Sequence, residues 1–152
     1  MTLSQQLSKH FQETFTGGNW SEVDLAYALE GVDLKTAMQK NGSKNSIAML
    51  VAHIHFYVAR VLKVLKGGEL QRGETDSFGH PPLETEKDWE NFKARVFQDA
   101  SEFAFLIAQL PEDKWGEVFA EEKYGTYFRN IVGIIEHSYY HIGQIAIIKK
   151  LR

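Results

Sequence analysis

The chain has 152 residues, a length that fits one domain with a sizeable core, which we take as residues 1–152. Its formal net charge is −3 and it has no dense cluster of Lys and Arg, so binding to nucleic acid is a poor fit. Because there is no cysteine, disulfides, thiolate nucleophiles and Cys-type zinc sites are excluded, and a metal would have to be bound by His, Asp or Glu.

The composition is that of a soluble protein, with 43% hydrophobic and 24% charged residues. The first fifteen residues lack the apolar core of a signal peptide, and no apolar run approaches the length of a membrane span. We therefore expect a cytoplasmic protein that has no membrane partner.

The N-terminal third predicts one long helix followed by short helical segments. Apolar residues at steps of four predict a helix over residues 3–15 that buries Leu3, Leu7, Phe11 and Phe15. Gly17 and Gly18 end this helix. Residues 21–29 and 33–38 predict two short helical stretches, and residues 41–45 form a loop.

The most hydrophobic helix is predicted over residues 47–65, with Ser46 as its N-cap. This helix carries His53 and His55, and both have apolar neighbours. Two residues apart, they cannot share a helix face. At most one of them can therefore join a site with other histidines, and periodicity does not select between them.

A long connection, rich in Gly and Pro, is predicted over residues 67–83. Connections of this length in a compact domain are usually functional or disordered. We expect a crossover or lid above the helices. His80 precedes a proline within this connection, and we expect it to be exposed to solvent rather than to bind a metal.

Two further long helices are predicted over residues 86–110 and 127–151, from apolar residues at steps of three and four. Between them, residues 114–125 predict an irregular or short extended stretch. Four long amphipathic helices indicate an all-α four-helix bundle with the long connection between its second and third helices. In such bundles, sites are commonly built from side chains on facing helices.

The last predicted helix carries His137 and His141 within its apolar stripe. Side chains at i and i+4 are neighbours on a helix face, so both imidazoles can point at one atom. The spacing leaves two interpretations open, metal ligands or core histidines with ordinary hydrogen bonds. If His53 or His55 supplies a third ligand, one position stays open for water or substrate, as in catalytic zinc sites.

Three neighbours of His141 have alternative roles. We expect Gln144, one turn further on, either to form a hydrogen bond within the site or to a substrate, or to be a partly buried amide bonded to a neighbouring helix. Tyr140 lies either beside the pocket or in the core. Gly143 is expected to allow a close approach between helices.

Several enzyme classes lack their motifs here. Because Glu136 precedes the first histidine and Ser138 follows it, the H-E-x-x-H motif of zinc peptidases is absent. The chain has no nucleophile-elbow sequence and no Gly-rich phosphate-binding loop.

Three stretches resemble the DinB-like, YfiT-type superfamily. The stretch from His137 to Gln144 resembles its C-terminal helix, in which H-x-x-x-H is followed by a Gly-Gln pair. Residues 45–54 are similar to its second-helix motif, in which a Ser-Ile opening precedes a His-Leu or His-Ile pair. Residues 20–32 are similar to members whose first linker carries a short helix.

The resemblance implies a bundle of mixed connectivity that forms a homodimer and has a three-histidine site for a divalent metal. It selects His53 over His55, so the implied ligands are His53, His137 and His141. The implied metal is zinc or nickel, with iron or manganese as alternatives. Characterised relatives include thiol S-transferases that use low-molecular-weight bacterial thiols and a mycothiol-dependent isomerase.

Two functional hypotheses follow. In the first, the protein is an enzyme of hydrolase or thiol S-transferase type, whose metal activates water or a thiol for reaction with a small molecule. In the second, it is a non-catalytic helical-bundle protein for binding or dimerisation, and its histidines are structural. An open, wet pocket at the site favours the first hypothesis, and a closed, dry core favours the second.

Overall fold

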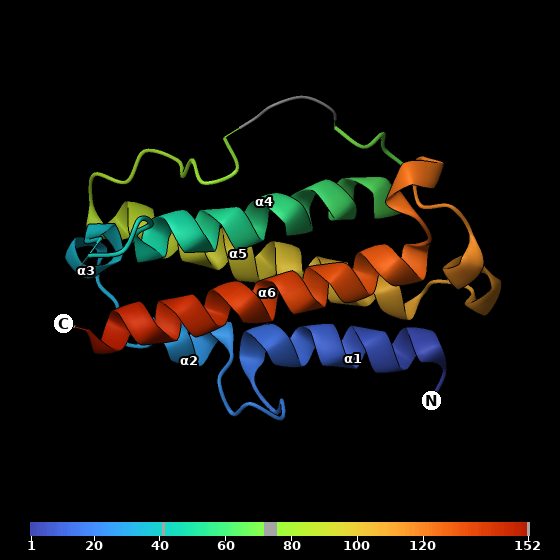
Figure 1. Cartoon of the computed structure of the whole chain (residues 1–152), viewed down its shortest axis with the longest axis horizontal. Helices are drawn as coiled ribbons and strands as arrows, with labels where there is room; N and C mark the ends of the chain where they lie inside the picture. The colour runs from blue at the N-terminus through green and yellow to red at the C-terminus, as the bar shows by residue number, and fades with distance from the viewer. Residues whose placement is uncertain (41, 72–75, 152) are drawn as a thin grey trace.

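The computed structural model describes residues 1–40, 42–71 and 76–151, which fold as an all-α bundle (Figure 1). The long helices are α1 (Leu3–Thr16), α4 (Ile47–Leu65), α5 (Glu86–Ala108) and α6 (Tyr127–Lys150). The short helices are α2 (Leu25–Leu29) and α3 (Leu34–Met38). The predicted fold class is confirmed, and each long helix ends within two residues of its predicted bounds.

All four long helices begin at a Ser or Thr that caps them. The side-chain oxygen of each cap accepts a hydrogen bond from the backbone N–H three residues further on, at Thr2, Ser46, Thr85 and Thr126. A cap of this kind contributes about 1 kcal/mol. The helix starts are therefore local properties of the sequence.

The long helices form a ring in which α1 and α4 each contact both α5 and α6. This places α5 and α6 on one diagonal of the bundle and α1 and α4 on the other. Figure 1 shows that the chain runs in one direction along α1 and α6 and in the opposite direction along α4 and α5.

The long connection follows from this arrangement, because α4 and α5 are neighbours that run the same way. A chain leaving α4 has to return along the helix, about 28 Å for 19 residues, before α5 can begin. Figure 1 shows the described parts of the connection, up to residue 71 and from residue 76, above α4, so the predicted long connection between the second and third long helices is confirmed. Residues 72–75, and Asn41 of the predicted loop, lie outside the described residues.

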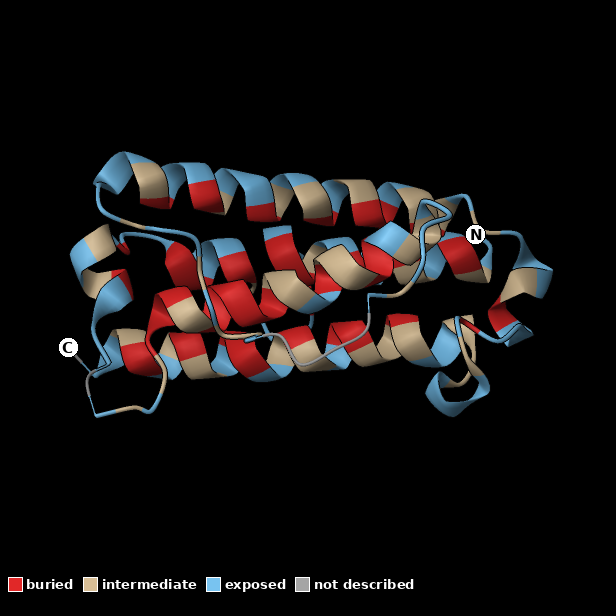
Figure 2. Ribbon diagram, turned by 90° about the horizontal axis from the view of Figure 1, so that it is seen from above, coloured by how far each residue is buried: buried red, intermediate tan, exposed pale blue. Residues whose placement is uncertain are grey.

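The buried side chains lie between the helices, as Figure 2 shows. α4 contributes most to this core and is the one helix in the described chain that is long and apolar enough to cross a membrane, with a mean hydropathy of 1.5. The expectation that no apolar run reaches this length is therefore wrong for α4. Because 56% of the apolar stretch of α4 is buried within the bundle, its apolar side chains are those of a core helix.

α1 buries a face that is shifted from the predicted stripe. Leu3 and Leu7 are only half-buried, whereas Ser4 and Ser8 are buried. The Ser8 hydroxyl donates a hydrogen bond of 2.6 Å to the carbonyl of Ala104 in α5. Small hydroxyl side chains at this contact allow α1 to lie close to α5, which periodicity alone does not reveal.

The stretch before α6 contains two short 3-10 helices, η1 (Glu112–Gly116) and η2 (Glu122–Tyr124). An isolated antiparallel bridge joins Val118 to Thr126. This agrees with the predicted irregular or short extended stretch. The bridge brings η2 beside the first turns of α6, where it borders the site described next.

Candidate metal centre

Three histidines from two helices meet inside the bundle. His53 comes from α4, and His137 and His141 come from α6. One ring nitrogen of each lies within 4.8 Å of the other two, and the ring centroids are 4.5 to 4.9 Å apart. His53 and His141 are each only 7% exposed, and His137 is half-buried. The fold thus brings together three histidines close enough to hold a metal ion.

The spacing of the nitrogens is close to what a metal requires. Tetrahedral zinc with bonds of 2.0–2.1 Å places its nitrogen ligands about 3.4 Å apart. From the upper limit of 4.8 Å, the nitrogens have to approach by at most about 1.4 Å. Small rotations about the side-chain bonds of a histidine cover this distance.

The surroundings favour the neutral form of His137 and His53 by lowering the pKa of each. Burial is the main cause that lowers the pKa of His137 to about 4, and the imidazoles of His141 and His53 act in the same direction. Burial and His141 also lower the pKa of His53, while a hydrogen bond with the Ser77 carbonyl opposes the change. The neutral form is the one that binds metals, since it keeps a lone pair on one ring nitrogen.

Two of the three histidines have their other ring nitrogen engaged. His141 Nδ1 lies 2.6 Å from Gln144 Oε1, and His53 Nδ1 lies 3.3 Å from the carbonyl oxygen of Ser77 and 3.0 Å from its hydroxyl. Amide and carbonyl oxygens only accept hydrogen bonds, so Nδ1 carries the proton and Nε2 keeps its lone pair. Metal-binding histidines are held in place in this way.

The third histidine has a nitrogen that lacks a partner. His137 Nδ1 is buried and has no hydrogen-bond partner among the residues that the structure describes. The centroid of the His137 ring lies 4.5 to 4.9 Å from the ring centroids of Tyr57, His53 and His141. A buried polar atom without a partner costs about 1–3 kcal/mol. The three imidazole nitrogens are a donor set that fits a divalent cation, and a cation bound at the cluster would offset the cost of this unpaired atom.

The crossover supplies two contacts that the sequence analysis missed. The ring of Phe78 stacks on that of His53, with centroids 3.8 Å apart and an angle of 5° between the planes. Ser77 provides the acceptor for His53 Nδ1. The length of the connection pointed to a function, but hydrophobic periodicity identifies buried residues only in helices and strands.

The structure shows the contacts and exposure of Gln144, Tyr140 and Gly143, the three neighbours of His141. Gln144 bonds to His141 within the same helix, as in the first of its two predicted roles, and its Nε2 donates a hydrogen bond of 3.4 Å to the Tyr140 hydroxyl. Tyr140 is 64% exposed and is not a core residue. Gly143 is also exposed, and an added Cβ would meet no atom within 4 Å, so the predicted close helix approach is absent within the described chain.

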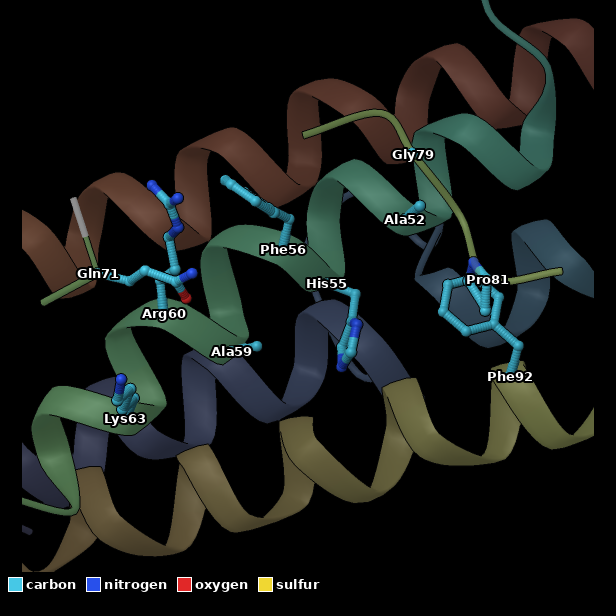
Figure 3. A pocket seen from close by; sticks show the side chains of 10 residues that line it. All are labelled: Ala52, His55, Phe56, Ala59, Arg60, Lys63, Gln71, Gly79, Pro81 and Phe92. Atoms are coloured by element: carbon cyan, nitrogen blue, oxygen red, sulfur yellow. The ribbon is translucent and has the colours of Figure 1, made fainter. Parts of the chain in front are cut away.

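His55 of α4 and His80 of the long connection lie outside the three-histidine cluster. His55 Nε2 is 2.6 Å from Asp99 Oδ2 of α5. Figure 3 shows His55 beside a separate cavity of about 240 Å³ that Phe92 and Pro81 also line. His80 Nδ1 lies 2.8 Å from the Pro81 carbonyl oxygen, and His80 is half-buried rather than exposed as predicted. The tertiary structure therefore selects His53, which periodicity did not.

A cleft of about 680 Å³ opens beside His137. It lies between η2, the first turns of α6 and Tyr57 of α4. Aromatic rings and charged groups both line it, including Phe128, Lys123 and Arg129. A small molecule in this cleft would reach the histidine cluster at His137.

No family model, no curated protein and no solved structure matches this chain. The class of protein is therefore defined by its own fold and site. It is an all-α helical bundle with a group of three histidines, on two facing helices, that is able to hold a metal ion.

Proposed function

We propose that the protein is a metal-dependent enzyme in which His53, His137 and His141 hold a divalent cation and a small molecule reacts beside it. The observation that carries this proposal is the convergence of three imidazoles whose nitrogens lie within 4.8 Å of one another. The resemblance of the histidine motifs to the DinB-like superfamily supports it, since that family implies the same three ligands.

The donor set favours zinc or nickel. Imidazole suits zinc, nickel, iron and copper, whereas manganese prefers carboxylate and water ligands. Within the described residues, the metal-binding group contains no Asp or Glu. Iron remains an alternative, and manganese fits this donor set less well.

With three protein ligands, a position stays open, and the bound cation would lower the pKa of a water or thiol there. Gln144 holds the ring of His141 in the orientation and tautomer that a ligand needs. Phe78 covers one face of the His53 ring and keeps bulk water from it. We propose hydrolysis or thiol S-transfer as the reaction type.

The cleft beside His137 is the proposed substrate site. Tyr57 and Phe128 would contact the apolar part of a small molecule, and Arg129 would pair with a carboxylate. A low-molecular-weight thiol that carries a carboxylate has this chemistry. We propose that the reaction takes place in the cytoplasm, where such thiols are kept reduced. A chain without cysteine is compatible with that compartment.

The metal content of tag-free protein tests the proposal. We expect about one equivalent of zinc or nickel per chain by mass spectrometry, and its loss in His137→Ala and His53→Ala. His55→Ala is the matched control, because it removes an imidazole from the same helix outside the cluster. If wild-type protein neither carries stoichiometric metal nor binds added zinc or nickel, the non-catalytic bundle is the correct reading.

A thiol-transfer or hydrolysis assay with zinc-loaded protein tests the substrate site. Arg129→Ala should raise KM for a carboxylate-bearing substrate by about tenfold or more and leave the metal content unchanged. Arg95→Ala is the control, since Arg95 is exposed on α5. Equal KM values for the two variants would remove Arg129 from the substrate site.

A further inference from the structure

The cavity beside His55 lies outside the three-histidine cluster and has a volume of about 240 Å³. Figure 3 shows its walls, which come from α4, from Phe92 of α5, and from Gln71, Gly79 and Pro81 of the long connection. A protein cavity of about 150 Å³ is large enough to hold benzene. This cavity therefore has room for one six-membered ring with a short substituent.

Alanines on α4 leave this space open. Ala52 and Ala59 both line the cavity, and because they are seven residues apart they lie on one face of the helix, two turns from each other. Larger apolar side chains fill other buried positions of α4, such as Ile47, Ile54 and Val61. At the two alanines the connection therefore covers a gap instead of a packed surface.

The part of the connection that covers the cavity is held by a turn. Asp76 Oδ1 accepts a hydrogen bond of 3.0 Å from the backbone N–H of Phe78, and the Asp76 carbonyl accepts one of 3.3 Å from the N–H of Gly79. Phe78 stacks on His53, with ring centroids 3.8 Å apart, and so joins the same turn to α4. The cover of the cavity is thus built into the fold.

One end of the cavity suits an aromatic ring. Phe92 is only 7% exposed, and the ring of His55 packs against it edge to face, with centroids 6.0 Å apart and an angle of 85° between the planes. Asp99 Oδ2 lies 2.6 Å from His55 Nε2 and holds this imidazole in place. Aromatic rings attract one another at centroid distances of about 4.5–7 Å. A ligand ring beside Phe92 and Pro81 would extend this cluster.

The other end of the cavity is positively charged. Arg60 and Lys63 both line it, about one turn apart on α4 (Figure 3). The guanidinium carbon of Arg60 lies 4.1 Å from the centroid of the Phe56 ring. A guanidinium has five N–H donors, so it can serve several acceptors at once. Because none of the described lining residues is Asp or Glu, an anionic group matches this end, and a carboxylate matches the planar guanidinium.

We propose that this cavity is a binding site for a small aromatic carboxylate. The ring would lie against Phe92 and Pro81, and the carboxylate would pair with Arg60 and Lys63. His55 beside the ring and Arg60 beside the carboxylate are five residues apart, about 7.5 Å along the helix axis. A short aliphatic linker between ring and carboxylate covers this distance together with the side chain of Arg60.

The proposed site is independent of the metal and of the reaction. Among the described residues, none lines both this cavity and the cleft beside His137, and none belongs both to the cavity and to the three-histidine cluster. That cleft also contains an arginine and aromatic rings, so an experiment has to distinguish the two places.

A chemical-shift titration of ¹⁵N-labelled protein with 3-phenylpropionate tests the proposal. We expect one saturable site per chain with a dissociation constant of about 1 mM or lower. 3-Phenylpropionamide keeps the ring and lacks the charge, so it should bind at least about tenfold more weakly. Propionate lacks the ring and should cause no saturable shift up to about 10 mM. Equal affinities for the acid and the amide would overturn the proposal, since the positive end of the cavity would then play no part.

Two substitutions test the two ends of the cavity. Ala59→Leu fills the space without a change in charge and should remove detectable binding, and Arg60→Gln should weaken it at least about tenfold. Ala94→Leu, at an exposed position on α5, and Lys66→Gln, at an exposed position next to the end of α4, are the matched controls because neither residue lines the cavity. Far-UV circular dichroism and thermal midpoints establish that each variant is folded.

A measurement on wild-type protein avoids substitutions in the cavity. Nuclear Overhauser contacts should join the ring protons of 3-phenylpropionate to the side chains of Phe92 and Pro81. Contacts to Phe128 instead, or binding that Arg129→Ala weakens and Ala59→Leu leaves unchanged, would place the ligand in the cleft beside His137 and overturn the proposal. So would the absence of any saturable shift up to about 10 mM 3-phenylpropionate.

Discussion

Replacement of Gln144 by leucine tests whether the His141 ring is held for metal binding. Gln144 Oε1 lies 2.6 Å from His141 Nδ1, and His141 is only 7% exposed. Leucine has a similar size and a good helix propensity, so the substitution removes the acceptor and leaves α6 intact. Nδ1–H of His141 then loses its partner in a place that water reaches poorly.

The expected loss follows from the tautomer. Without an acceptor at Nδ1, the proton moves to Nε2 in part of the molecules, and these molecules have no lone pair for the cation. Loss of such a partner weakens metal binding by about 10–100-fold, or about 1.4–2.7 kcal/mol. Because the bond is short and His141 is buried, we expect a loss near the upper end of this range.

Zinc titration against a chromophoric chelator measures the effect. Gln144→Glu keeps an acceptor oxygen and should bind zinc within a few-fold of wild type. Gln98→Leu, at an exposed site on α5, controls for the added apolar surface. If Gln144→Leu binds zinc as tightly as wild type while His141→Ala does not bind it, the bond between Gln144 and His141 has no role in metal binding.

Three further predictions concern stability. His55→Ala leaves Asp99 without its partner and should lower the free energy of unfolding by about 1–3 kcal/mol in urea titrations; an unchanged midpoint would show that water replaces His55. Ser8→Ala removes the buried bond to the Ala104 carbonyl and should cost about 1 kcal/mol in the same assay, and a stabilised variant would contradict this packing argument. For metal-free protein, the pKa of His137 is lowered to about 4, so below pH 6.5 the unfolded chain binds a proton that the folded chain does not. The contribution of His137 to the free energy of unfolding should therefore be fully present above pH 6.5 and decrease by up to about 3 kcal/mol as the pH falls to 4. The free energy of unfolding should depend less steeply on pH in His137→Gln, measured by urea titrations at each pH.

The sequence was sufficient for the helices and for part of the site. Apolar residues at steps of three and four locate α1, α4, α5 and α6, and a Ser or Thr before each one marks its start. The pairing of His137 with His141 also follows from the sequence, since their spacing places them on one helix face. These features are local, because a helix satisfies its backbone hydrogen bonds within itself.

Periodicity left the choice between His53 and His55 open, the resemblance implied His53, and the tertiary structure supplies the physical reason. Both lie among apolar residues of α4, but α6 packs against one side of this helix and α5 against another. His53 lies on the side of α6 and meets His137, whereas His55 lies on the side of α5 and bonds Asp99. Periodicity describes how apolar a face is, and it does not state which helix covers it.

The contacts of the crossover are also decided by the tertiary structure. Because α4 and α5 are adjacent and run the same way, the connection returns over α4 and places Ser77 and Phe78 on His53. Gly143 illustrates the same limit, since glycine in a helix suggested a close neighbour and the fold leaves that side of α6 open. The sequence by itself determined the helices and two of the three imidazoles, because both depend on residues a few positions apart. Hydrophobic periodicity did not locate the third imidazole, which the resemblance implied. Only the packing of the helices brings it to the other two and decides which residues hold it and which face of α6 remains exposed, because these depend on segments far apart in the chain.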